Sequence, residues 1–195
     1  MGIPIIIALI GPAASGKDTL AKELWRYMKM ENIDCNFLVS DTTRPMRPKE
    51  EDGVDYIFRT NEEFFEKFHN GDYAEWTEYR EWFYGTDKSQ IKEGYNIGVF
   101  NVNGIFSLKQ KGYIVVPIFL AVPFWTRMKR YKDRAGKITF EQFRRAIADM
   151  TDFANVDIIL ECMFPRTHLV LKSSEILENC DKITQHLVSL GLENH

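Results

Sequence analysis

Residues 11–17 read Gly-Pro-Ala-Ala-Ser-Gly-Lys, which matches the phosphate-binding pattern G-x-x-x-x-G-K. The glycines let backbone N–H groups converge on phosphate oxygens, and the start of a following helix adds partial positive charge. Lys17 has the length and charge to reach the β- and γ-phosphates of a nucleoside triphosphate. We therefore expect the triphosphate to be bound by Gly11, Ala13, Ala14, Ser15, Gly16, Lys17, Asp18 and Thr19.

Asp18 stands where this pattern usually has a Ser or Thr whose hydroxyl touches Mg²⁺. A carboxylate is a good ligand for a hard cation, so we predict that Asp18 holds Mg²⁺ directly or through water. Thr19 is rotated by about 100° around the helix and does not replace the missing hydroxyl. The alternative is that Asp18 only stabilises the start of the helix.

A second group of polar residues indicates a phosphate-bearing partner. Arg44 and Arg47 lie three apart in a proline-rich loop, and arginine forks suit a bidentate grip on phosphate. Tyr56 follows with a phenol donor, and the pairs Glu75-Trp76 and Tyr84-Gly85-Thr86 come at a cluster of aromatic residues. Taken one at a time, the arginines could be solvated loop charges and Glu75 a surface acid.

Strands alternating with helices must position these residues. The apolar run 3–10 predicts a strand buried on both faces, and Leu20, Leu24 and Met28 mark the buried side of the next helix. Further strands are predicted at 36–40, 97–102, 114–122 and 156–160, with a bulge or an edge position at Pro117. Capping boxes at Thr60 and Thr139 open two helices, and Ser173 or Ser174 caps a helix that ends near Gly191. This order predicts an α/β layered fold with a mainly parallel sheet.

Composition restricts the class of protein. The 195 residues carry 25 Lys and Arg against 28 Asp and Glu, a net charge of −3 that disfavours nucleic-acid and membrane-surface binding. The chain has three cysteines, which are widely spaced and form no Cys-x-x-Cys pair. This pattern favours a reducing, cytoplasmic location. The longest apolar run is too short to span a bilayer. We expect a monomer or homodimer that binds small molecules.

From Ile3 to about Leu160 the chain resembles the guanylate kinase family of P-loop nucleoside monophosphate kinases. That family has, after the phosphate loop, V-S-x-T-T-R-x-x-R, G-x-D-Y-x-F, E-W and Y-Y-G-[ST], and this chain has matching segments at residues 39–47, 53–58, 75–76 and 83–86. The resemblance implies a three-layer P-loop fold as a single domain over residues 1–195. The implied core is about 1–37, 91–125 and 151–195, with a GMP-binding acceptor lobe at about 38–90 and a lid at about 126–150.

The resemblance also implies a reaction, the transfer of the γ-phosphoryl of ATP, with Mg²⁺, to GMP or dGMP. The phosphate of GMP would be bound by Ser40, Arg44, Arg47, Tyr56 and Tyr84. Glu75 would accept hydrogen bonds from guanine N1–H and the 2-amino group, and Thr86 would bind the other edge of the base. Adenine lacks such a pair of donors and would leave a buried charge unpaired. The catalytic cations would be Lys17, Arg44 and the lid residues Arg130, Arg134 and Arg145, with Arg144 an alternative to Arg145.

One segment departs from the family. Residues 99–104 read V-F-N-V-N-G where the family usually has D-x-D-x-Q-G, so Asn101 replaces a carboxylate expected near the metal and the guanine. We still place Asn101 among the GMP-binding residues. Either activity is lost, or the charge has moved across the metal site to Asp18. The sequences G-K-D-T and V-N-G also resemble the ribose 1,5-bisphosphate phosphokinase family, which gives an alternative sugar-phosphate kinase. A catalytically inactive binding module is the other alternative.

Overall fold

The computed structural model describes residues 3–172 and 175–192, except for the side chains of residues 134 and 135. Within these residues the main sheet has five parallel strands in the order β2-β7-β1-β8-β9. The strands are β1 (Pro4–Ile10), β2 (Cys35–Phe37), β7 (Gly94–Val99), β8 (Ile114–Leu120) and β9 (Leu169–Leu171). The predicted α/β class is confirmed, and β1 at the centre carries the phosphate loop at the carboxyl edge of the sheet.

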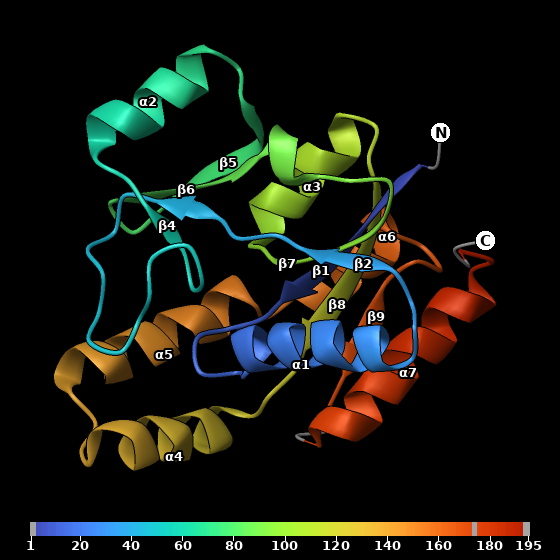
Figure 1. The fold of residues 1–195 in the computed structure, drawn as a ribbon. Helices are drawn as coiled ribbons and strands as arrows, with labels where there is room; N and C mark the ends of the chain where they lie inside the picture. The colour runs from blue at the N-terminus through green and yellow to red at the C-terminus, as the bar shows by residue number, and fades with distance from the viewer. Residues whose placement is uncertain (1–2, 173–174, 193–195) are drawn as a thin grey trace.

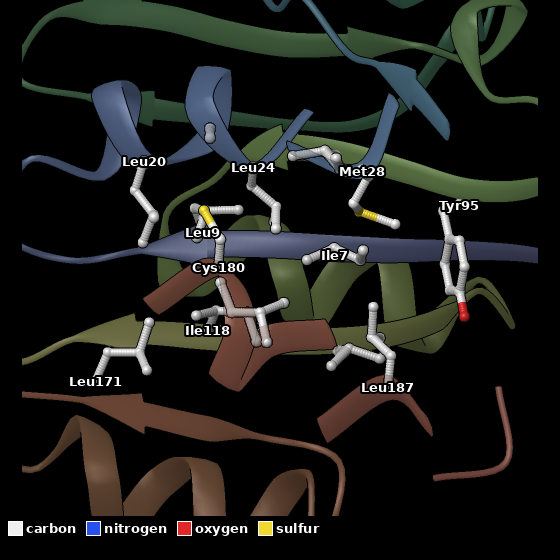
Figure 2. Close-up of a cluster of buried hydrophobic side chains, with 14 of the residues drawn as sticks. Ile7, Leu9, Leu20, Leu24, Met28, Tyr95, Ile118, Leu171, Cys180 and Leu187 are labelled. Carbon is white, nitrogen blue, oxygen red and sulfur yellow. The ribbon is translucent and has the colours of Figure 1, made fainter. Parts of the chain in front are cut away.

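Helices cover both faces of this sheet because the side chains of β1 alternate between two cores. Ile5, Ile7 and Leu9 belong to one core, and the residues between them belong to the other. The first core is closed by α1 (Lys17–Met30) and α7 (Ile176–Ser189), as Figure 2 shows from Leu20, Leu24, Met28, Cys180 and Leu187. The second is closed by α3 (Val102–Gln110) and α6 (Val156–Met163). The result is a three-layer α/β/α arrangement.

A second sheet lies apart from the main one and carries several predicted site residues (Figure 1). In the described part of the chain its order is β4-β3-β6-β5. The strands are β3 (Asp41–Thr42), β4 (Ile57–Phe58), β5 (Tyr73–Tyr79) and β6 (Trp82–Asp87), with the short η1 (Lys88–Gln90) after them. Helix α2 (Asn61–His69) buries Phe64 against Tyr73, with ring centroids 4.6 Å apart. The capping box predicted at Thr60 is confirmed.

Two helices between β8 and α6 lie toward the N-terminal end of α1 (Figure 1). They are α4 (Phe124–Ala135) and α5 (Phe140–Asp152), and the capping box predicted at Thr139 opens α5. Trp125 on α4 is 77% exposed, and α5 turns Phe143, Ile147 and Met150 toward solvent. The inward face of α5 instead holds Ala146 and Asp149.

Some expectations about the elements are wrong. The strand predicted at 156–160 is helix α6, in which the buried residues Val156 and Leu160 have helical spacing. The last strand is instead β9, only three residues long. The strand predicted at 97–102 spans Gly94–Val99, and α3 begins at Val102. The cap expected at Ser173 or Ser174 lies outside the described residues, and Glu175 is the N-cap residue of α7.

Pro117 is tolerated within β8 for a reason that the sequence did not reveal. β8 lies between β1 and β9, and its pairing with β1 continues through Pro117 opposite Ala8 without a shift. β8 is therefore not an edge strand, and it has no bulge at Pro117. β9 pairs only from Ile118 onward, so Pro117 precedes that ladder.

None of the described helices is both long and apolar enough to cross a membrane.

Candidate active site

The phosphate loop joins β1 to α1 with a backbone that only some residues adopt easily. Gly16 is the N-cap of α1 with φ 93°, a left-handed conformation in which glycine has no steric penalty. Ala14 has φ 61° in the same loop. A Cβ on Gly16 would also lie 3.2 Å from Nη1 of Arg130, so the end of that side chain would have to shift slightly to make room for it.

A cavity of about 600 Å³ opens between the phosphate loop, the second sheet and α5. The predicted residues that line it are Ala13, Ala14, Gly16, Lys17, Asp18, Thr19, Ser40, Arg44, Arg47, Tyr56, Tyr84 and Arg145. A smaller cavity of about 130 Å³ shares Lys17, Ser40 and Tyr84 with it and extends to Glu75 and Asn101. Gly11 lines the smaller cavity, and Ser15 is a buried residue of the loop itself. The structure thus brings most of the predicted site residues around two cavities that share part of their lining.

The predicted phosphate-gripping arginines differ in their surroundings. Arg44 is 7% exposed, and its Nη2 donates to both carboxylate oxygens of Glu50, at 2.8 and 3.0 Å. Burial alone would lower the pKa of Arg44, but Glu50 more than offsets this and raises it. Arg47 is exposed, and its backbone N–H donates to Glu50. Burial and the charge of Asp18 raise the pKa of Tyr56, which keeps its phenol protonated as a donor.

Glu75 lines the smaller cavity. Its side chain is buried, and Oε1 accepts a 2.7 Å hydrogen bond from Oγ1 of Thr86. Burial raises the pKa of Glu75 to about 7, and Thr86 and Lys111 counteract this only in part. A Cβ on Gly104 would lie 2.7 Å from Oε2 of Glu75, so the first turn of α3 fits closely around the carboxylate. The Glu75 carboxylate is thus a buried group with two acceptor oxygens, and it lies beside the Thr86 hydroxyl.

Asn101 is the N-cap of α3. Its Oδ1 accepts from the Gly104 backbone N–H at 2.7 Å, and its Nδ2 donates to Oγ1 of Thr77 at 2.5 Å. The residue thus lines the smaller cavity while both ends of its amide have intramolecular partners. The hydrogen-bond partner of the neutral Asn101 amide is therefore the neutral hydroxyl of Thr77.

The predicted lid arginines occupy different positions. Arg145 is partly buried and lines both cavities, whereas Arg144 is exposed, so the geometry favours Arg145. Arg130 lines neither cavity, and its Nη1 donates to the backbone carbonyl oxygens of Ala14, at 3.2 Å, and of Ser15. The side chain of Arg134 lies outside the described part of the chain.

Asp18 faces the larger cavity beside Lys17, with 3.3 Å between Oδ2 and Nζ. Among the described residues, no three His, Cys, Asp or Glu side chains are grouped to hold a metal ion. Mg²⁺ commonly binds one or two protein carboxylates and completes its shell with substrate phosphates and water. A single carboxylate beside a phosphate loop fits that mode of binding.

Sequence reasoning missed several residues that organise the site. Glu50 pairs with Arg44, and Lys22 of α1 reaches Asp55 of the second-sheet loops at 2.7 Å. Asp149 of α5 accepts a 2.9 Å hydrogen bond from the backbone N–H of Ala13 in the phosphate loop. None of these pairs has a local sequence pattern. The sequence offers one hint for Asp149: it lies three residues after Ala146, so the two residues share one face of α5.

The parallel sheet, the phosphate loop at the end of its central strand and the adjoining cavities define a P-loop kinase fold. A family model described as guanylate kinase matches residues 4–184, so the chain belongs to the guanylate kinase family. The guanylate kinase of Thermotoga maritima is 35% identical over 129 residues, covering 64% of this chain and 60% of the relative. The guanylate kinase of Streptococcus pneumoniae is 38% identical over 124 residues, covering 61% and 58%. These alignments thus span about three fifths of the curated relatives.

Among solved structures, a guanylate kinase from Anaplasma phagocytophilum superimposes with a TM-score of 0.70 at 24% identity, over 100% of this chain and 89% of that chain. This likeness supports the fold. The family match does not favour the sugar-phosphate kinase alternative.

Proposed function

We propose that this chain transfers the γ-phosphoryl group of ATP, with Mg²⁺, to GMP or dGMP, giving ADP and GDP or dGDP. The observation that carries the proposal is the buried carboxylate of Glu75 beside the Thr86 hydroxyl, at a cavity that Gly11, Ala13 and Lys17 of the phosphate loop also line. Guanine presents two adjacent donors, N1–H and the 2-amino group, that an ionised carboxylate accepts. An adenine in the same position would leave the charge unpaired.

The acceptor phosphate is proposed to lie against Ser40, Arg44, Arg47, Tyr56 and Tyr84. Its distance from the base is set by the second sheet, in which Glu75 pairs with Thr86 and Thr77 pairs with Tyr84 across β5 and β6. Arg44 supplies positive charge to this phosphate, and Tyr56 supplies a protonated phenol that can donate a hydrogen bond to it. Fixing both ends of the nucleotide holds one phosphate oxygen ready for in-line attack.

The transfer needs no covalent intermediate with the protein. An oxygen of the acceptor phosphate forms a bond to the γ-phosphorus, the bond from that phosphorus to the β–γ bridging oxygen breaks, and its electron pair stays on ADP. Lys17 and N–H groups of the loop other than that of Ala13, which donates to Asp149, bind the donor phosphates. Arg145 lines both cavities and stabilises charge on the transferred group. Arg130 supports the loop through its carbonyl oxygens, and Arg134 is proposed as a further lid cation.

Asp18 is proposed to hold Mg²⁺ directly or through water. Bound Mg²⁺ would neutralise charge on the donor phosphates. Asn101 then serves the acceptor side by positioning the start of α3 behind Glu75.

A coupled ADP-release assay with MgATP tests the proposal against GMP, dGMP, AMP, CMP, UMP, dTMP and ribose 1,5-bisphosphate. Turnover confined to GMP and dGMP is expected, and Lys17→Ala should remove turnover with every acceptor. Turnover only with the sugar bisphosphate would refute the role of Glu75. No turnover with any acceptor, together with GMP binding, would instead favour an inactive binding module.

A further inference from the structure

One carboxylate, that of Asp149 on α5, contacts three separate segments of the fold. Its Oδ2 accepts from the backbone N–H of Ala13 in the phosphate loop at 2.9 Å and lies 3.4 Å from Nη1 of Arg127 on α4. Its Oδ1 accepts from the phenol of Tyr79 at 3.3 Å and lies 3.5 Å from Nη2 of Arg80. Tyr79 ends β5, and Arg80 belongs to the turn between β5 and β6. The phosphate loop, the lid and the acceptor lobe therefore meet at this side chain.

The burial of this cluster makes its contacts depend on one another. The side chain of Asp149 is 1% exposed and that of Arg127 is 3% exposed, so water cannot replace a lost partner. A buried charge is costly unless it is paired and hydrogen-bonded. Moving the acceptor lobe or the phosphate loop away from α5 would thus leave the carboxylate less well compensated.

Two partners of Asp149 lie at the two ligand sites. Ala13 lines both cavities, and Tyr79 lines the smaller one together with Glu75. We propose that Asp149 is a positioning residue that couples the two sites, so that a nucleotide bound at the phosphate loop increases the affinity of the acceptor lobe for its own nucleotide. The inference rests on the proposed function for the identity of the two ligands. By linkage, each ligand must raise the affinity of the other by the same factor.

Arg80 offers a way to break one arm of the cluster. Arg80 and Glu81 have φ values of 53° and 71° in a two-residue turn, a geometry that favours Asn at the first position. Arg80→Asn therefore keeps the turn and removes the cation. Arg80 is not among the described residues that line either cavity, so its loss does not remove a ligand contact.

Titration calorimetry measures the coupling directly. The dissociation constant of GMP is determined with and without a non-hydrolysable ATP analogue and Mg²⁺, and the reverse titration checks reciprocity. We expect Asp149→Asn to lower the coupling factor about tenfold, because the charge is lost while an oxygen remains for Ala13. Arg80→Asn should lower it roughly threefold, as fits a partly exposed ion pair. The double variant should behave like Asp149→Asn alone.

Asp152→Asn is the matched control, since Asp152 lies on the exposed side of the same helix and its coupling factor should equal that of the wild type. A wild-type factor of one, or an unchanged factor in Asp149→Asn, would overturn the inference even if the variant lost stability. If Asp149→Asn does not fold, an unchanged factor in Arg80→Asn overturns it instead. A wild type that does not bind GMP refutes the proposed function separately. The coupling is then measured with the acceptor identified by turnover, and the same criteria apply.

Discussion

Glu75→Gln is expected to stabilise the folded chain at pH 8 while weakening its binding of GMP. Burial raises the pKa of Glu75 from 4.5 to about 7, so the charged form is disfavoured in the folded state. The difference, 7 − 4.5 = 2.5 units, corresponds to about 3 kcal/mol at about 1.36 kcal/mol per unit. Gln keeps an oxygen that can accept from Thr86 but carries no charge, so the variant avoids this cost.

The sign of the pH dependence follows from the raised pKa. The raised pKa means that the contribution of Glu75 to the free energy of unfolding is fully present below pH 4.5. That contribution is lost as the pH rises to 7, because the buried carboxyl group must then ionise in the folded state. The stability advantage of Glu75→Gln should therefore be close to zero at pH 4.5 and about 3 kcal/mol at pH 8.

Urea unfolding followed by circular dichroism at the two pH values measures this difference. Glu78→Gln is the control, because Glu78 is exposed on the same strand and should show no such change. GMP binding by Glu75→Gln should fall at pH 8, because a neutral amide offers only one acceptor oxygen and a donor that opposes the guanine donors. An equal change in stability at both pH values, or a less stable variant at pH 8, would refute the account of Glu75 as a costly buried charge.

Four further outcomes are expected. Wild-type affinity for GMP should fall about tenfold between pH 8 and pH 6, as Glu75 takes up a proton, and a flat calorimetric profile would contradict this. Gly104→Ala should raise the KM for GMP and leave that for ATP unchanged in steady-state assays, because the new methyl displaces the Glu75 carboxylate. Asp18→Asn should raise the Mg²⁺ concentration for half-maximal turnover at least about tenfold, and an unchanged Mg²⁺ titration would exclude the metal role. Lys49→Gly should raise the free energy of unfolding in urea by about 0.5–1 kcal/mol, because Lys49 has φ 76° and glycine adopts this left-handed conformation without strain. Lys137→Gly is the control and should not raise it, because Lys137 does not have a left-handed conformation.

The elements with strong local signals could be predicted from sequence. The strand before the phosphate loop and the caps at Thr60 and Thr139 each depend on neighbouring residues, and the structure confirms them. The run at 156–160 failed because a short apolar segment rich in β-branched residues fits a strand or a helix equally well. β9 was missed because three residues between polar neighbours give no periodicity. On α5, the apolar stripe of Phe143, Ile147 and Met150 would indicate a buried face, yet it faces solvent.

The site was predictable to the extent that its residues belong to linear motifs. Lys17, Arg44 and Glu75 lie in such motifs, and the structure gathers them around two cavities that share part of their lining. Asp149 could not be found in this way, because its partners lie up to 136 residues away along the chain. The pairing of Arg44 with Glu50 was likewise hidden, since either residue alone is an ordinary loop charge.

The exposed indole of Trp125 on α4 has a spectroscopic consequence. The other three tryptophans are Trp25 on α1 and Trp76 and Trp82 on the second sheet, so the three-layer core, the second sheet and α4 each contain at least one natural fluorophore. A chain that retains only Trp125 would emit as a largely hydrated indole, and any closure that covers this side chain would shift its emission to shorter wavelength. Stopped-flow fluorescence of chains that each retain a single tryptophan would follow α4 and the second sheet separately, without an attached dye.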